Sequence, residues 1–387
     1  MSSLVLELTR QLVRFDTVNP PGAERSCAQF LAARLEHAGF EVRTFEHHEQ
    51  RTSLVARIEG AADTVPLCLT GHLDTVPLGA TPWCCDPFAG EVHDGRIYGR
   101  GTSDMKGGIA AMVIAATDMA AYVRGSSGLT LVFTASEETG CQGAAYLASS
   151  RQALGRAGAM VVAEPTGNYP LLGHRGALWL RARTRGVSAH GSTPHLGVNA
   201  LYKAAQVVRK LETYRFARTG SVELGAPSLS VGTLRGGHNV NMVPDEAVLE
   251  VDVRTLPAQR HAALLTEMRR FLGPEVQVEP MIDLQGLFTD PGDPWVIEVF
   301  DLIKERTGER PVPRGAPYFT DASYLSPAYG GVPTIILGPG DAELAHQTDE
   351  SCSIARLEQS VELYRELISR WSARGRLAAQ IKTSAVC

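Results

Sequence analysis

A histidine and an acid, two residues apart, follow a short apolar run in the first quarter of this sequence. Residues 66–70 are typical of a buried strand, and Gly71 is expected to end that strand. His72 and Asp74 are therefore expected at the carboxyl end of a strand. Because imidazole nitrogens and carboxylate oxygens bind zinc and related ions, this pair is a candidate metal site.

Three further apolar runs end in the same way. Residues 129–135 lead to Glu137 and Glu138, residues 159–163 lead to Glu164, and residues 332–338 lead through a Gly/Pro loop to His346. In open α/β sheets, ligands bind outside the carboxyl ends of the strands. Four strand ends that carry histidines and acids are therefore expected to surround one crevice. That convergence is more specific than any single motif.

Asp104 is a candidate from a different kind of element. The glycine-rich residues 99–108 precede an apolar, alanine-rich stretch, 109–122, that is expected to be helical. Asp104 or Ser103 should then lie near the helix N-terminus, where free N–H groups and the helix dipole favour an acid. An ordinary N-cap is an equally good interpretation of Asp104 taken alone. The other candidate ligands favour a metal-binding role.

The ligand types indicate which metal is expected. Two histidines with carboxylates, in a chain without a C-x-x-C motif, favour zinc, with cobalt or manganese as alternatives. The seven cysteines are odd in number, and Cys84 and Cys85 are adjacent. Residues 1–10 read as an amphipathic helix rather than a secretory leader, so we expect reduced thiols and a cytoplasmic protein.

Length and charge exclude several classes of partner. The chain has 387 residues and a net charge of −5, with acidic and basic residues interspersed. Two domains are expected at this length, and no basic stripe for nucleic acid is visible. No stretch approaches about 18 uninterrupted apolar residues, so we expect no membrane span, and we interpret residues 109–121 as a core helix.

The order of predicted elements divides the chain into three segments. Residues 1–175 alternate helices and strands, which predicts an α/β fold with a mixed, mostly parallel sheet covered by helices. Residues 176–288 are predicted to form strand 177–185, helix 199–211, strands 228–235 and 247–255, helix 258–272 and strand 276–281. This βαββαβ order is that of an inserted ferredoxin-like domain. Residues 289–387 return to helices and a strand and complete the first domain.

These motifs together resemble a known family, the zinc metallopeptidases that include acetylornithine deacetylase, succinyl-diaminopimelate desuccinylase, aminoacylase and glutamate carboxypeptidase. The resemblance runs nearly end to end. It rests on residues 71–77, 99–101 with 104–107, 137–138, 163–166, 189–192 with Pro194, 241–244, and His346.

The resemblance implies two divalent metal ions and a role for each ligand. His72, Asp104 and Glu164 would hold one ion, and Asp104, Glu138 and His346 the other, with Asp104 bridging. Asp74 would accept a hydrogen bond from His72 and fix its tautomer, as groups behind a metal-bound imidazole usually do. Glu137, which is free of metal, would be the general base that carries a proton from water to the leaving amine.

The resemblance also assigns residues of the inserted domain. His190 would reach the active site of a partner subunit and stabilise the oxyanion, which implies a homodimer formed through this lid or dimerisation domain. Asn241 and Arg254 would grip the substrate, since a guanidinium binds both oxygens of a carboxylate. Asp321 lies where the family carries a short substrate-side motif.

Several functions remain open at this point. The preferred one is hydrolysis of an N-acyl-L-amino acid, as by acetylornithine deacetylase, to a carboxylate and a free amino acid. Desuccinylase, dipeptidase and glutamate carboxypeptidase-like activities share the same ligands. A non-catalytic metal-binding scaffold is an alternative of another class, but it should have lost Glu137 or Asp104. Serine hydrolase and dinucleotide-binding motifs are both absent from the sequence.

Overall fold

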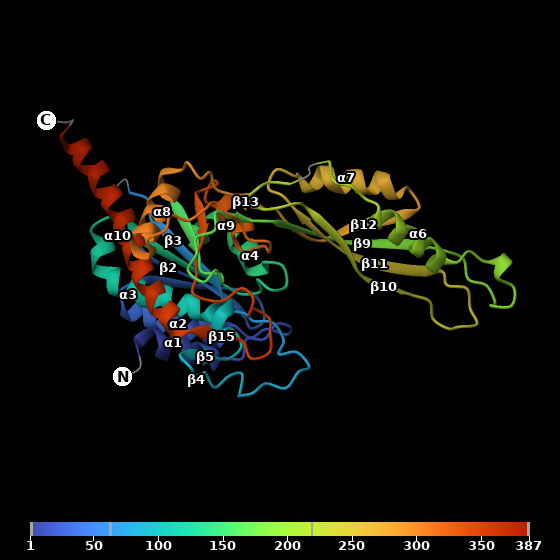
Figure 1. The fold of residues 1–387 in the computed structure, drawn as a ribbon, viewed down its shortest axis with the longest axis horizontal. Coiled ribbons are helices and arrows are strands. Elements are labelled where there is room, and N and C mark those ends of the chain that lie inside the picture. Colours follow the sequence, from blue (N-terminus) through green and yellow to red (C-terminus); the bar gives the residue numbers. More distant parts are fainter. Residues whose placement is uncertain (1–2, 62–63, 218–219, 385–387) are drawn as a thin grey trace. The chain divides into compact units, whose positions relative to one another are not determined.

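The computed structural model describes residues 3–61, 64–217 and 220–384, and it consists of two compact units (Figure 1). Unit 1 comprises Met1–Leu172, Thr289–Pro313 and Thr320–Cys387. Unit 2 comprises Gly173–Phe288 and Arg314–Phe319.

Unit 1 is built on a six-stranded sheet with the order β1-β2-β6-β3-β7-β14. Its strands are β1 (Glu41–His48), β2 (Arg51–Glu59), β3 (Leu67–His72), β6 (Gly128–Thr134), β7 (Ala159–Val162) and β14 (Thr334–Ile336). Strands β6, β3, β7 and β14 run parallel, whereas β1 and β2 pair antiparallel at one edge. Every residue of β3, β6 and β7 is buried, which is why these strands read as continuous apolar runs. The predicted mixed α/β fold is confirmed.

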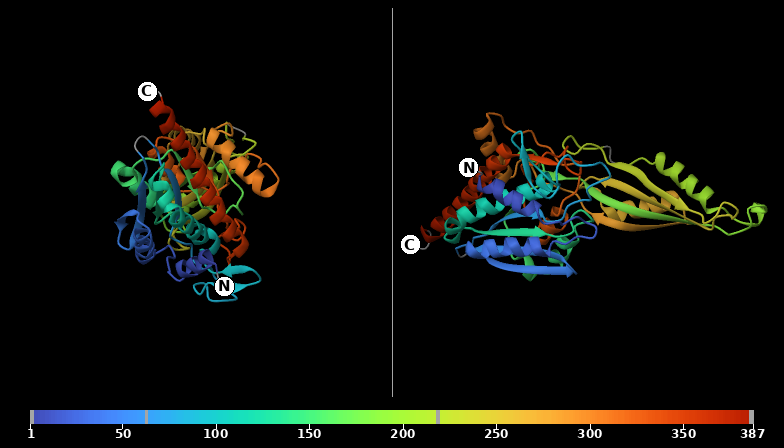
Figure 2. Two further views of the ribbon diagram at one scale, coloured as in Figure 1. Left: turned by 90° about the vertical axis from the view of Figure 1, so that its left-hand side faces the viewer. Right: turned by 90° about the horizontal axis from the view of Figure 1, so that it is seen from below.

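Helices cover this sheet, and the longest buried one is α3. The helices of unit 1 are α1 (Leu4–Val13), α2 (Arg25–His37), α3 (Gly107–Arg124), α4 (Gln142–Ser149), α5 (Arg151–Leu154), α8 (Pro294–Thr307), α9 (Ala322–Ala328) and α10 (Ile354–Ser384). Helix α3 packs on β2, β3 and β6, and both α1 and α10 pack on α3 (Figures 1 and 2). Among the described residues, 102–124 form the one helical segment long and apolar enough to cross a membrane, yet most of it is buried within the protein.

Gly71 does not end β3, contrary to the sequence expectation. The strand continues to His72, which pairs with Thr134 of the neighbouring strand. A Cβ atom at position 71 would lie 2.8 Å from the side chain of Met105. Glycine therefore allows close packing of β3 against the side chain of Met105, and it does not break the strand.

Asp104 is not an N-cap, so that interpretation was wrong. Helix α3 begins at Gly107, and its N-cap position is Lys106. Asp104 lies in the preceding turn, Thr102–Lys106, with non-helical backbone angles of φ −125° and ψ 93°. A smaller sheet, β15-β5-β4, lies beside this turn and contains β4 (Glu91–His93), β5 (Arg96–Tyr98) and β15 (Ser351–Ser353).

Unit 2 is a four-stranded antiparallel sheet with two helices. Its elements are β9 (Gly176–Arg185), α6 (Ala200–Glu212), β10 (Ser228–Gly236), β11 (Glu246–Thr255), α7 (His261–Leu272) and β12 (Val276–Leu284), with the sheet order β10-β11-β9-β12. A short 3-10 turn, Pro194–Leu196, and a two-stranded pair, β8 (Gly173–His174) with β13 (Leu287–Phe288), complete the unit. Side chains alternate in burial along β11, and the buried ones form a core with α6 and α7. The lid or dimerisation role of residues 176–288 stays a prediction.

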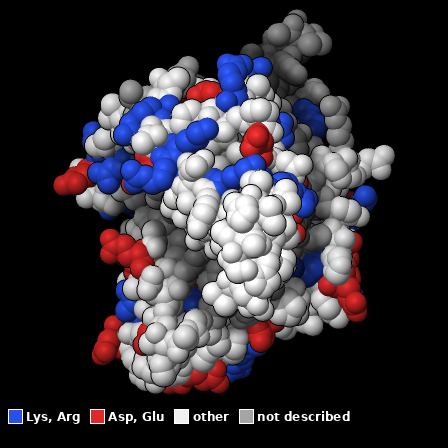
Figure 3. Space-filling view, turned by 90° about the vertical axis from the view of Figure 1, so that its right-hand side faces the viewer, with Lys and Arg blue, Asp and Glu red and all other residues white. Residues whose placement is uncertain are grey.

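One exposed segment of unit 2 contains no charged residue. Residues 187–198 contain no Lys, Arg, Asp or Glu. Figure 3 looks onto the end of unit 2 where Figure 1 draws this segment, and the surface nearest the viewer there carries no charged side chain. Val187, Leu196 and Val198 are exposed on the segment.

Six cysteines fall within the described ranges, and all of them are free thiols. The Sγ atoms of Cys84 and Cys85 lie 3.9 Å apart. Cys387 lies outside the described residues.

Candidate metal centre

Unit 1 brings together the five predicted metal ligands. His72 is the last residue of β3, Glu138 and Glu164 follow β6 and β7, Asp104 lies in the turn before α3, and His346 lies in the loop after β14. The carboxyl ends of the parallel strands lie on the same side of the sheet, so residues far apart in the sequence meet there.

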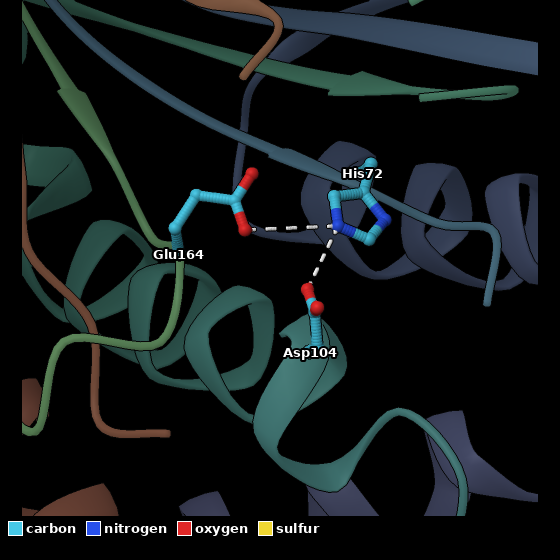
Figure 4. Close-up of side chains that lie close together, drawn as sticks. All are labelled: His72, Asp104 and Glu164. Atoms are coloured by element: carbon cyan, nitrogen blue, oxygen red, sulfur yellow. Dashed lines mark hydrogen bonds and ion pairs between the residues drawn. The ribbon is translucent and has the colours of Figure 1, made fainter. Parts of the chain in front are cut away.

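The first group of ligands consists of His72, Asp104 and Glu164 (Figure 4). The Nε2 atom of His72 lies 3.0 Å from Oδ1 of Asp104 and 3.8 Å from Oε2 of Glu164. All three side chains are buried. One nitrogen and two carboxylate oxygens converge from separate elements, and both are ligand types that zinc takes.

The second group consists of Asp104, Glu138 and His346. The Nε2 atom of His346 lies 3.3 Å from Oδ2 of Asp104 and 3.2 Å from Oε1 of Glu138. Asp104 therefore faces one histidine with each of its two oxygens. That is the geometry required of an acid shared by two ions.

Electrostatics at the centre favour bound positive charge. Burial by itself lowers the pKa of His72, but the hydrogen bond to Asp104 and the charge of Glu164 outweigh it and hold this pKa well above its usual value. Hydrogen bonds to Asp104 and Glu138 raise the pKa of His346 to about 10. Burial raises the pKa of Glu164 well above its usual value. Three clustered acids, Asp104, Glu138 and Glu164, surround two imidazoles, and divalent metals fit this arrangement of charge.

The orientation of His72 is fixed by a backbone carbonyl. Its Nδ1 atom lies 2.9 Å from the carbonyl oxygen of Asp74 and 3.7 Å from the Asp74 carboxylate. Because a carbonyl only accepts hydrogen bonds, Nδ1 must carry a proton. In the neutral imidazole Nε2 then has the lone pair, on the side of Asp104 and Glu164, where it could bind a metal ion. Asp74 thus accepts the hydrogen bond from His72 through its backbone carbonyl, and its carboxylate is left for other donors.

The Asp74 carboxylate instead holds the turn that carries the paired acids. It accepts the backbone N–H of Glu137 at 3.0 Å and that of Glu138 at 3.2 Å. The side-chain amide of Asn19 also donates to it at 2.8 Å and to Thr139 Oγ1 at 3.0 Å. Asp74 is fully buried, so these donors are what stabilises its charge.

Glu137 is set apart from its neighbour in the chain. It is 4% exposed and belongs to neither ligand group, although Glu138 belongs to the second. Burial, with added repulsion from Glu164 and Glu138, raises the pKa of Glu137 well above its usual value. A raised pKa suits a carboxylate that must hold a proton and release it again.

Comparisons with known proteins agree with this geometry. The family model described as peptidase family M20/M25/M40 matches residues 68–370. The acetylornithine deacetylase of Proteus mirabilis (strain HI4320) is 30% identical over 95% of this chain and 96% of its own length. The succinyl-diaminopimelate desuccinylase of Stenotrophomonas maltophilia (strain R551-3) is 29% identical over 95% of this chain and 99% of its own length.

The chain belongs to peptidase family M20/M25/M40. The family predicted from the motifs is thereby confirmed, and the chain is a metal-dependent hydrolase of amide bonds. A solved tripeptidase from Staphylococcus aureus subsp. aureus Mu50 has the same fold, with a TM-score of 0.77 at 22% identity, over 96% of this chain and 98% of the other.

Among the other predicted site residues of this M20-family chain, Asp321 lies in the interior of unit 1. It is 2% exposed and accepts a hydrogen bond from Thr134 Oγ1. Burial raises its pKa to about 6. A contact with substrate stays a prediction for this side chain.

The remaining predicted residues belong to unit 2. His190 is exposed, and its Nδ1 atom accepts the backbone N–H of Ser192 at 3.1 Å. In the neutral imidazole the proton is then on Nε2, which is left as a hydrogen-bond donor. Asn241 is exposed, and Arg254 pairs with Asp252 at 2.9 Å and lies over the ring of Phe319. The substrate contacts of all three stay predictions.

Sequence reasoning missed the residues that support the ligands of this M20-family centre. Asn19 contacts Asp74 because residues 17–19 run beside residues 73–75, with a bridge between Val18 and Thr75. Glu350 bonds the backbone of the Asp104 turn. Neither Asn19 nor Glu350 lies in a sequence motif or a periodic pattern that would predict its contacts. Only the tertiary fold brings them to the centre.

Proposed function

We propose that this chain is a di-metal amidohydrolase that cleaves the amide bond of an N-acyl-L-amino acid, in the manner of acetylornithine deacetylase, to a carboxylate and a free amino acid. One observation carries the proposal. Two ligand groups share Asp104, while a buried acid next to them, Glu137, belongs to neither group.

The two groups would hold one ion each. His72, Asp104 and Glu164 fit the first ion, and Asp104, Glu138 and His346 fit the second. Zinc is the proposed metal, with cobalt or manganese as alternatives. Such ions supply acidification of water, polarisation of the amide carbonyl and stabilisation of developing negative charge.

Glu137 would perform the proton transfers. Its carboxylate would accept a proton from the attacking water and deliver it to the leaving amine nitrogen, so that the amine departs uncharged. The bonds from Asp74 to the backbone of residues 137 and 138 support these distinct roles, because they hold the two successive side chains in fixed orientations.

The proposed substrate class rests on the relatives. The Proteus mirabilis relative is a deacetylase, and the Stenotrophomonas maltophilia relative, a desuccinylase, supports succinyl substrates as a second candidate. A non-catalytic scaffold is disfavoured because the sequence retains both Glu137 and Asp104.

A substrate panel tests the proposal. Purified chain with added zinc, cobalt or manganese would be assayed on N-acetyl, N-succinyl and N-glutamyl amino acids and on dipeptides. The proposal expects the highest kcat/KM on an N-acetyl amino acid. Preference for succinyl substrates would favour the second candidate, and preference for dipeptides would contradict the N-acyl assignment.

Three finer features belong to the same proposal. The active form would be a homodimer joined through unit 2, with His190 donating a hydrogen bond to the oxyanion in the partner's site and with Asn241 and Arg254 binding substrate. The uncharged segment around His190, with exposed Val187 and Leu196, supports an interface there. The proposed location is the cytoplasm.

A further inference from the structure

Glu350 is a buried carboxylate that contacts no candidate metal position but bonds the backbone of the segment that carries Asp104. It has no exposed surface. Its Oε1 atom accepts the N–H groups of Ser103 at 2.8 Å and Asp104 at 2.9 Å. Its Oε2 atom accepts the N–H of Gly101 at 3.0 Å and Nη1 of Arg100 at 2.7 Å. Only an ionised carboxylate accepts all four donors at once.

The Asp104 turn depends on these bonds because its first N–H groups have no carbonyl acceptor within the turn. Ser103 and Asp104 lie at its start, where even a regular helix leaves N–H groups unpaired, and both Asp104 and Met105 have non-helical backbone angles. An unpaired buried N–H is costly, and Glu350 supplies the missing acceptor. The carboxylate therefore fixes the conformation that turns Asp104 towards both histidines.

Arg100 connects the same carboxylate to the loop that carries His346. The guanidinium is 1% exposed and donates from Nη1 to the carbonyl of Gln347 as well as to Glu350. Its Nη2 atom donates to the carbonyl of Pro77. Gln347 is the neighbour of His346. The Arg100–Glu350 pair therefore bonds the backbone next to two ligands of the second group, His346 and Asp104.

We infer that Glu350 is a positioning residue that holds the shared ligand Asp104, and with Arg100 the loop of His346, in the geometry required for metal binding. This inference rests on the proposed two-metal function. The carboxylate would act entirely through protein groups, since all four of its bonds are made within the chain.

Glu350→Gln tests the inference with nearly the same side-chain volume. The amide keeps one acceptor oxygen but presents an NH₂ donor where N–H groups now point. Metal-free protein would be titrated with Co²⁺ and followed by its visible absorption. We expect Co²⁺ to bind about 10- to 100-fold more weakly than to the wild type, as is usual when a group behind a ligand is lost, and we expect a changed absorption spectrum.

Two further variants sharpen the comparison. Glu343→Gln changes an exposed acid in the same loop and should leave Co²⁺ affinity and spectrum unchanged. Glu350→Asp keeps the charge but shortens the side chain, so its affinity should lie between those of Glu350→Gln and the wild type. Thermal unfolding of each metal-free variant shows whether it is folded.

Equal Co²⁺ affinity and identical spectra in folded Glu350→Gln and wild type would overturn the inference. If Glu350→Gln does not fold, the test passes to Glu350→Asp. Co²⁺ affinity and an absorption spectrum equal to those of the wild type in Glu350→Asp would then overturn the inference. Normal Co²⁺ uptake by wild type without hydrolysis of any amide would contradict the proposed function alone. A wild-type chain that binds no Co²⁺ would contradict both.

Discussion

The Nδ1 atom of His72 lies 2.9 Å from the backbone carbonyl oxygen of Asp74 and 3.7 Å from the Asp74 carboxylate. The main chain therefore selects the tautomer of the histidine. The carboxylate is left to accept the N–H groups of Glu137 and Glu138, which it orients. Asp74 follows β3, two residues after His72, yet its carboxylate supports the residues that follow β6.

Asp74→Asn should disturb the positions of Glu137 and Glu138 more than the position of His72. The amide replaces one acceptor with a donor that faces Asn19 or the backbone N–H groups. We expect a loss of about 10- to 100-fold in kcat or in affinity at the Glu138 position. Asn19→Ala, which removes one donor to the same carboxylate, should give a smaller loss.

Metal titration of Asp74→Asn distinguishes the two roles of Asp74. If the carboxylate fixed the tautomer of His72, the ion held with Glu164 would be weakened first. Loss of that ion, with the ion held by His346 retained, would contradict the backbone role described here.

The paired acids should respond differently to the same substitution. Glu137→Gln removes the proton carrier but no ligand, so metal content should be unchanged while kcat falls by about 10²- to 10⁴-fold. Glu138→Gln should weaken the ion held with His346. The measurement is metal content and steady-state kinetics on the same preparations, and near-normal turnover in Glu137→Gln would show that the base lies elsewhere.

Four of the five ligand positions could be predicted from the sequence because each lies at or after the end of a buried strand. Glu138, Glu164 and His346 come after apolar runs whose ends must meet in a parallel sheet, so pattern alone brings them together. The motifs, rather than the helical pattern, indicated Asp104, whose turn is not helical.

The supporting residues could not be predicted in this way. Glu350 bonds to residues almost 250 positions earlier in the chain, and no periodicity records such a contact. The usual role of glycine as a breaker does not apply to Gly71, which lies within β3 and close to the side chain of Met105. Contacts that depend on tertiary packing have no local signal.

His190 should act as a hydrogen-bond donor to the reaction rather than as a ligand. Its Nδ1 atom accepts from Ser192, which leaves Nε2–H free. His190→Ala should lower kcat by about 100- to 1,000-fold, as for the loss of one oxyanion donor, and should leave metal content unchanged.

Mixing His190→Ala chains with Glu137→Gln chains tests whether His190 acts across a homodimer. A hybrid dimer would contain one site with both an intact base and an intact donor, so part of the activity should return. A freely exchanging dimer without such rescue would assign His190 to its own subunit or exclude it from catalysis.

Asp321→Asn should stabilise the protein in a pH-dependent manner. Burial raises the pKa of Asp321 to about 6, so the folded state favours the neutral acid, and its stabilisation is lost as the pH rises through 6. The neutral amide avoids this loss. At pH 8 the variant should gain up to about 3 kcal/mol in free energy of unfolding, because the pKa of Asp321 is raised from 3.8 to about 6 in the folded state.

Chemical denaturation at pH 5 and pH 8 checks this prediction, because the gain should shrink at the lower pH. Asp94→Asn, at an exposed position, serves as the control. A gain in Asp321→Asn that is the same at both pH values would mean that the buried charge is not its cause.

Metal analysis of the active chain tests the two-metal centre most directly. Protein saturated with zinc, freed of excess metal and assayed in parallel should contain two divalent ions per chain. Chelation should abolish amide hydrolysis, and added metal should restore it. A fully active chain that contains one ion or none would contradict the shared role of Asp104 and with it the two-metal mechanism.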